Sequence, residues 1–288
     1  SASGATGSVT VGAISLGGGT IRDTNGNDAT LAFTAPTVTG VIVNRLAATV
    51  TVTNGLPTAP ATTKTSKLGD VIELTATFTS AVNVTGAPTI AGTVNTTTGP
   101  KAATFAYVSG SGTTALKFRY TVVANDLDTD GIDVAGQLVG TVNDLAGNAV
   151  GTAFTPPTTT AVLVDGVVPT VSGVTVPSAG VYTSTGTKDL DFTVNFNDAV
   201  AIVTTGGTPT LAITIGGVNR QAVYNAAASD LTNGKVVFRY SVTSADSASG
   251  ATGSVTVGAI SLGGGTIRDT NGNDATLAFT APTVTGVI

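Results

Sequence analysis

The first 42 residues of the chain return without change at its end. Residues 1–42 and 247–288 are identical, with an offset of 246 residues. This period is far longer than the roughly 20–50 residues of solenoid repeats, so each period can hold whole domains. The sequence therefore predicts a window on a tandem array. Such an organisation is typical of structural or adhesive proteins, and we expect no enzyme.

A weaker repeat lies inside this period, with a shift of about 121 residues. Gly86-Ala-Pro-Thr matches Gly207-Thr-Pro-Thr, and Phe118-Arg-Tyr matches Phe238-Arg-Tyr. We infer two diverged sister domains, residues 44–165 and 166–288. Residues 1–43 are then the closing strands of a preceding domain of the second type, and alone they could not bury a core. Either they belong to a longer polymer, which we favour, or they complete a neighbouring chain by strand addition.

Apolar and polar residues alternate strictly in several short stretches. Residues 190–196 read Leu-Asp-Phe-Thr-Val-Asn-Phe, and residues 72–78 repeat the pattern. This alternation indicates half-buried strands, and the Gly, Asn, Asp, Ser and Pro clusters between them indicate turns. The sequence predicts an all-β fold of tandem antiparallel immunoglobulin-like sandwiches, about seven strands each, arranged end to end. No long flexible linker separates the domains, so we expect a semi-rigid rod.

The composition excludes several classes of protein. The chain has no Cys, Met, Trp or His and a net charge of −5. Disulfides, common zinc sites and nucleophilic triads that need His or Cys are thereby excluded. An acidic chain without a basic stripe is not expected to bind nucleic acid, and the strand-sized apolar runs predict no membrane span in this segment.

The most distinctive acidic motif is Asp126-Leu-Asp128-Thr-Asp130-Gly-Ile-Asp133. Alternate carboxylates before a glycine are typical of calcium sites, because crowded carboxylates repel one another unless a cation or protons intervene. An EF-hand is excluded by Gln137 at the twelfth position and by the lack of flanking helices. The alternative is a solvated acidic turn.

A second motif lies near the end of each domain. It reads Asp144-Leu-Ala-Gly-Asn148 in the first and Asp269-Thr-Asn271-Gly-Asn273-Asp in the second, and residues 23–28 copy the latter. Asp or Asn followed by Gly most often forms a β-turn. We favour the turn and keep calcium binding as the alternative.

These motifs, in this order, resemble the bacterial immunoglobulin-like tandem repeats of giant secreted adhesins, many of them exported by type I secretion (repeats-in-toxin type). The resemblance covers both domains and includes Asp-x-Asp-Gly-Ile at 128–132, which the second domain lacks. It implies display outside a bacterial cell and calcium at domain junctions, with ligand roles for Asp126, Asp128, Asp130 and Asp144.

Sandwich topology extends the calcium hypothesis to a whole junction. We expect residues 126–133 and Asp165 to face residues 269–274 and Asp198 of the next domain. The opposite junction would bring Asp246, Asn44 and Asp144 to Arg45, whose guanidinium could replace a metal. The predicted calcium ligands are Asp126, Asp128, Asp130, Asp133, Asp144, Asp165, Asp198, Asp269, Asn271 and Asn273.

The leading functional hypothesis is a stalk or filament segment of a large extracellular or cell-surface protein. Its partners would be neighbouring copies of the same repeat, in a homopolymer or against a host or matrix surface. The first alternative is a self-assembling fibre or surface-layer subunit with lateral packing or strand exchange between chains. The second is a carbohydrate-binding module, for which exposed aromatic residues are scarce.

Overall fold

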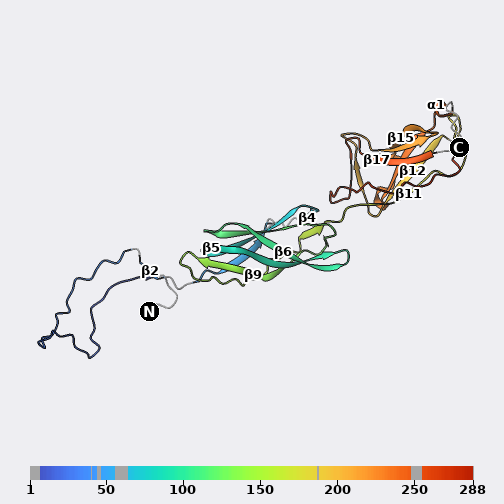
Figure 1. The fold of residues 1–288 in the computed structure, drawn as a ribbon. Helices are drawn as coiled ribbons and strands as arrows, with labels where there is room; N and C mark the ends of the chain where they lie inside the picture. The colour runs from blue at the N-terminus through green and yellow to red at the C-terminus, as the bar shows by residue number, and fades with distance from the viewer. Residues whose placement is uncertain are drawn as a thin grey trace.

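The computed structural model describes residues 7–39, 41–43, 47–55, 64–186, 188–247 and 255–287. Strands make up 51% of the structure and helices 4%, and the sheets are curled and mainly antiparallel. The predicted all-β class is therefore confirmed. Figure 1 shows an extended N-terminal segment followed by two strand-rich units. No helix in the described part of the chain has both the length and the apolar character needed to cross a membrane.

The first unit is built around one long strand, β5, which pairs with four others. A separate three-stranded sheet holds β4, β10 and β8, and β4 and β10 run parallel in it. The strands are β3 (Val50–Asn54), β4 (Lys64–Lys67), β5 (Val71–Thr96), β6 (Gly99–Ser109), β7 (Thr113–Thr121), β8 (Leu127–Asp128), β9 (Asp133–Asp144) and β10 (Val162–Asp165).

The second unit has a six-stranded sheet in the order β11-β12-β16-β15-β14-β17, and a separate pair of β13 with β18. The region that β5 spans without a break is divided here among β12, β13 and β14. The strands are β11 (Val171–Thr175), β12 (Asp189–Phe196), β13 (Ala201–Val203), β14 (Thr210–Ile215), β15 (Val218–Tyr224), β16 (Lys235–Ser241), β17 (Val255–Ser261) and β18 (Thr266–Arg268). The short helices are η1 (Ala226–Ala228), η2 (Leu231–Asn233) and α1 (Ser244–Ser247).

Each unit buries its own apolar cluster, as the alternating pattern predicts. In β12, every second side chain from Leu190 to Phe196 is at most 5% exposed. One cluster takes its residues from Ala48 to Val164, and the other from Leu190 to Val287. The large side chains Phe105, Phe118, Phe192 and Phe238 are fully buried in these clusters.

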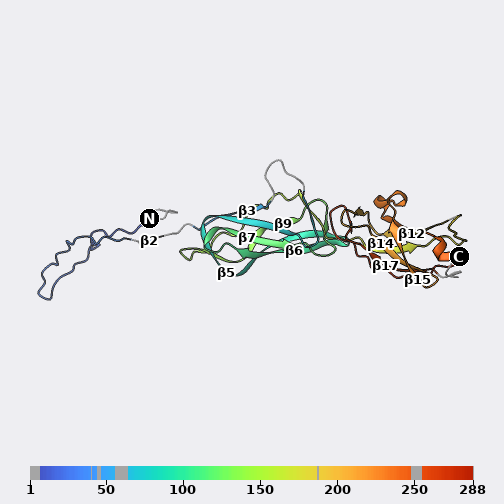
Figure 2. The same ribbon diagram turned by 90° about the horizontal axis from the view of Figure 1, so that it is seen from above.

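The N-terminal segment has the same sequence as the end of the second unit but a different environment. Its ends meet where β1 (Gly7–Ser8) pairs with β2 (Ile42–Val43). Between them the chain projects away from the first unit (Figures 1 and 2). We call residues 9–39 with Val41 the N-terminal copy, and residues 255–287 the closing segment. Ile21 is 49% exposed in the N-terminal copy, whereas Ile267 is 2% exposed in the closing segment.

Candidate functional site

The junction between the two units is formed by one turn, residues 269–273, which follows β18. The Asp269 carboxylate accepts hydrogen bonds from the backbone N–H groups of Asn271 and Asn273, both at 2.8 Å. It also accepts one from the Asn273 side chain at 2.7 Å. Gly272 takes a φ of 92°, which only glycine adopts without cost. The turn thus satisfies the Asp269 carboxylate within five residues, as the pure-turn interpretation predicts.

The side chains of this turn attach it to the first unit. Asn271 Nδ2 donates to the Asp165 carboxylate at 2.6 Å, and Asn273 Nδ2 donates to the Asp165 backbone carbonyl at 2.9 Å. The backbone N–H of Leu68 donates to Asn273 Oδ1 at 2.8 Å. Asp165 and Asn273 are 8% and 3% exposed, and buried polar groups of this kind need hydrogen-bond partners. The predicted encounter of Asp165 with Asn271 and Asn273 is present in the structure, made through amide donors.

The same turn forms at two other places. In the N-terminal copy, Asp23 accepts from the backbone of Asn25 and Asn27, both at 2.9 Å. In the first unit, Asp144 accepts from the backbone of Ala146 at 2.9 Å and of Asn148 at 2.8 Å. Several hydrogen bonds lower the pKa of Asp144, and the bond from the Asn148 side chain has the largest effect. The turn is therefore encoded locally, because it forms with or without a neighbouring unit.

Asp126, the first residue of the acidic motif, lies inside the first unit. It is fully buried and forms an ion pair with Lys101 on β6. The Tyr120 hydroxyl donates to it at 2.5 Å, and the backbone N–H of Val123 donates at 2.9 Å. Burial and the adjacent Asp126 raise the pKa of Tyr120 far above its ordinary value, so the hydroxyl stays protonated as the donor.

The second unit repeats this arrangement around Asp246. Arg220 Nε donates to Asp246 at 2.7 Å, and the Tyr240 hydroxyl and the Thr243 N–H donate at 2.8 Å each. Burial is the largest single influence on the pKa of Asp246 and acts to raise it. The hydrogen bonds from Thr243, Tyr240 and Arg220 together outweigh burial, so the pKa is lowered. In both units a Tyr at the end of the Phe-Arg-Tyr strand and a cation from the preceding strand hold an Asp six residues after the Tyr. We call this set the Tyr–Asp anchor.

Asp128 and Asp130 form a carboxylate pair beside Asn95. Asp128 is 2% exposed and accepts from the backbone N–H groups of Asn95 at 2.8 Å and Gly131 at 2.9 Å. The Asn95 side chain donates to Asp130 at 3.3 Å. Burial first, and then the neighbouring Asp130, raise the pKa of Asp128 above its ordinary value. The pair is therefore the place in the motif where a proton or a cation relieves repulsion.

Two further predicted ligands, Asp133 and Asp198, belong neither to the turn nor to this pair. Asp133 is exposed at the start of β9, and the Asp198 carboxylate accepts from the next N–H, that of Ala199, at 2.7 Å. Asn44 and Arg45, predicted for the opposite junction, lie outside the described residues.

The donor set fits a calcium ion only in part. Among the described residues, no group of three or more acidic side chains is placed to hold a metal ion. The oxygens of Asp126 already face Lys101 and Tyr120, whereas Asp128 and Asp130 offer two carboxylates of the hard type that calcium prefers. Calcium binding stays a prediction, and this pair is where the donor chemistry suits it.

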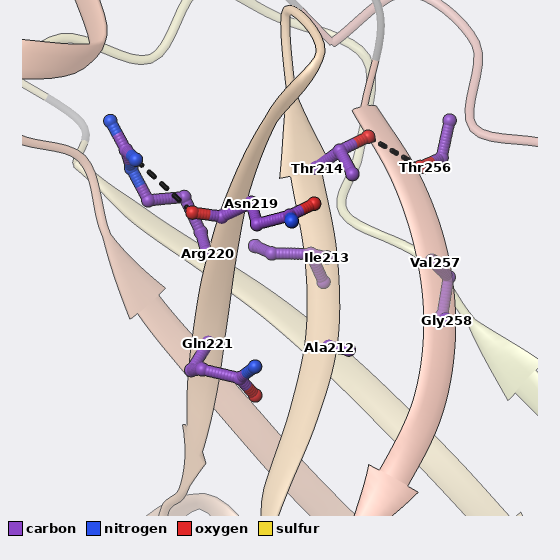
Figure 3. A pocket seen from close by; sticks show the side chains of 9 residues that line it. All are labelled: Ala212, Ile213, Thr214, Asn219, Arg220, Gln221, Thr256, Val257 and Gly258. Atoms are coloured by element: carbon purple, nitrogen blue, oxygen red, sulfur yellow. Dashed lines mark hydrogen bonds between the residues drawn. The ribbon is translucent and has the colours of Figure 1, made fainter.

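A shallow hollow of about 330 Å³ lies on the second unit, between β14, β15 and β17. Figure 3 shows the short bond between the Thr214 and Thr256 hydroxyls at its rim, 2.5 Å long. Asn219 and Gln221 extend from β15 beside it. The lining contains no aromatic side chain of the kind that stacks on sugars.

No protein-family model and no curated protein matches the chain. Among solved structures, a DUF4785 family protein from Legionella pneumophila aligns with 10% sequence identity and a TM-score of 0.22. The alignment covers 81% of this chain and 56% of that protein.

Sequence reasoning missed the Tyr–Asp anchor and the role of Leu68. A signal for the anchor was present, because Tyr120 and Tyr240 each precede an Asp by six residues. The cations, Lys101 and Arg220, come from neighbouring strands whose register the sequence does not reveal. The Leu68 contact uses a backbone N–H and has no side-chain signal.

Proposed function

We propose that the chain is a spacer segment of an extracellular bacterial filament or stalk, in which immunoglobulin-like sandwiches follow one another end to end. The observation that carries this proposal is the docked junction at Asp165. β10 ends at Asp165 and β11 begins at Val171, so only five residues connect the two units. The turn at 269–273 attaches directly to both Asp165 and Leu68. A spacer needs joints of this kind, because a rod keeps its length only if successive units hold their orientation.

The sequence of the repeat supports a regular array with two kinds of joint. At the other joint Asn44 occupies the position of Asp165, and Ala146 occupies the position of Asn271. Both members of the Asn271–Asp165 hydrogen bond are therefore replaced together. We infer that joints of the observed type alternate along the filament with joints that lack this bond.

We further infer that Asp128 and Asp130 bind calcium. These residues lie near the end of the first unit that faces the second, because Val164 and Asp165 pair with Asp128 and Leu127. A cation at the carboxylate pair would offset its repulsion and stiffen the segment next to the junction.

Asn271→Ala tests the spacer function at its joint. Ala already occupies the equivalent place in the turn of the first unit, so the turn itself should survive. Nitroxide labels at two cysteines, Val139→Cys and Val181→Cys, report the distance between the units, and the chain has no other Cys. These sites are 58% and 66% exposed. We expect one narrow distance distribution before the substitution and a broad one after it.

Asn25→Ala is the matched control, because it makes the same change in the N-terminal copy of the turn. It should leave the distance distribution unchanged. A broad distribution in the chain without Asn271→Ala would mean that the joint is not docked in solution, and the spacer proposal would then fail.

A further inference from the structure

Asn271, which attaches the second unit to the first, is followed in the chain by glycine. Asn-Gly pairs occur at Asn25, Asn54, Asn233 and Asn271. Asn is a thermolabile residue. It is most labile before glycine, because glycine has no Cβ to hinder attack of its backbone nitrogen on the Asn side chain. The joint therefore contains a residue that can be modified without an enzyme.

The local geometry leaves Asn271 open to this reaction. Asn271 is exposed, so water reaches it. The attacking group is the backbone N–H of Gly272, which donates to the Asp269 carbonyl at 3.3 Å, whereas the equivalent N–H groups of the other three pairs donate at 3.1 Å. A donor–acceptor distance of 3.3 Å exceeds the usual range of about 2.7–3.2 Å, so this hydrogen bond restrains the Gly272 nitrogen only weakly.

The reaction needs only water. The Gly272 nitrogen forms a bond to Asn271 Cγ and gives up its proton, and the Cγ–Nδ2 bond breaks, so that Nδ2 leaves with that proton as ammonia. Water then opens the resulting succinimide ring at one of its two carbonyl carbons, which gives aspartate or isoaspartate. In the net change, one amide and one water become one carboxylate and one ammonium ion.

A carboxylate at position 271 removes the hydrogen bond that docks the joint. The Asn271 amide donates to Asp165 at 2.6 Å, and an ionised carboxylate has no proton to donate there. Asp165 is 8% exposed, and its other oxygen accepts from the N–H of Val167 at 3.0 Å, which holds it in place. Two carboxylates would then meet and repel each other. Lys67, whose side chain lies beside Gly272, can offset one of these charges but not both. Isoaspartate also lengthens the main chain of the turn by one methylene group.

We propose that Asn271 is a deamidation site and that its conversion releases the joint. This inference rests on the proposed spacer function, because it gives the docked joint a limited chemical lifetime. At the other joint Ala146 occupies the position of Asn271 and has no side-chain amide to lose. An ageing filament therefore loses stiffness at every second joint, while the joints between them lack this site.

Ageing of the full chain tests the proposal. The chain carries the nitroxide labels at Val139→Cys and Val181→Cys and is kept in warm, mildly alkaline buffer, which favours loss of the Gly272 N–H proton. Ion-exchange chromatography separates the products by their added negative charge, and peptide mass spectrometry locates each conversion. We expect chains converted at Asn271 to give a broad distance distribution and unconverted chains to keep the narrow one.

Two matched comparisons separate the joint from a general effect of charge. Chains converted only at Asn25 gain the same charge in a turn of the same sequence, and their distance distribution should stay narrow. Asn271→Asp places the carboxylate at the joint without ageing, so it should give the broad distribution in the fresh protein. Asn25→Asp, the control for that variant, should leave the distribution narrow.

Two results would overturn this inference and leave the spacer function in place. One is a narrow distance distribution either in aged chains converted at Asn271 or in the Asn271→Asp variant. The other is no conversion at Asn271 after a synthetic peptide of residues 267–275 has converted completely in the same buffer. A broad distribution in the fresh, unconverted chain would instead overturn the spacer function, and this inference with it.

Discussion

Ile267→Ala and Ile21→Ala make the same chemical change in the same local sequence, and we expect very different costs. Ile267 is 2% exposed and belongs to the core of the second unit, opposite Ile202 on β13. Truncating a buried Ile to Ala loses transfer free energy and leaves a cavity, about 2–5 kcal/mol in total. Ile21 is 49% exposed and outside both clusters, so its truncation should cost no more than about 0.5 kcal/mol.

The assay must resolve the two units, because a two-unit chain need not unfold in one step. Hydrogen exchange followed by mass spectrometry over a urea series gives the opening free energy of peptides from β12 and β16. Ile267→Ala should lower this free energy by about 2–5 kcal/mol. The first unit should be unaffected and serves as the internal reference.

The difference in cost between Ile267→Ala and Ile21→Ala tests whether the two copies differ in burial in solution. If their costs differed by less than about 1 kcal/mol, the exposure contrast between the two copies would not describe the chain in solution. Equal and large costs would mean that the N-terminal copy is buried as deeply as the closing segment.

Three further predictions concern the first unit. Tyr120→Phe removes a donor from buried Asp126 and should cost about 1–3 kcal/mol by calorimetry, and a loss below the error of the method would refute the role of the anchor. Asp130→Asn should stabilise the unit at pH 7, because it removes a carboxylate that helps to raise the pKa of Asp128. A raised pKa contributes stability that is fully present below the ordinary pKa of 3.8 and is lost as the pH rises through the folded-state pKa. The gain should shrink toward pH 4, and any rise in melting temperature caused by calcium should disappear in this variant. Glu73→Gln breaks exposed pairs with Lys117 and Arg119 and should cost at most about 1 kcal/mol, a cost that 1 M salt should largely remove.

The sequence predicted strands wherever side chains alternate between core and solvent. Residues 190–196 fall within β12 and residues 72–78 within β5, because burial on one face needs that spacing. The turn at 269–273 was predictable for a similar reason, since all its bonds are local.

Non-local pairing limited the rest of the prediction. Lys101 reaches Asp126 only because β6 lies beside β7 in one particular register, with Tyr107 opposite Phe118. The alternating carboxylates of the acidic motif suggested one ligand loop, but Asp126 is directed to this cation and Asp128 to the backbone of Asn95. Spacing along the chain does not reveal such a separation of neighbouring side chains.

The parallel pairing of β4 with β10 determines how the first unit responds to tension along a filament. Force enters ahead of β3, which pairs with β5, and leaves through the end of β10. Once β3 has detached, β4 and β10 are pulled in opposite directions along their length. Their four paired positions, from Lys64–Val162 to Asp165–Lys67, are then loaded in shear and must give way together. Among the described residues of the second unit, parallel geometry is limited to two single bridges, Thr170–Thr276 and Gly180–Val287. Under a steady pull the second unit should rupture first, at the lower force, and release contour length while the first unit remains folded.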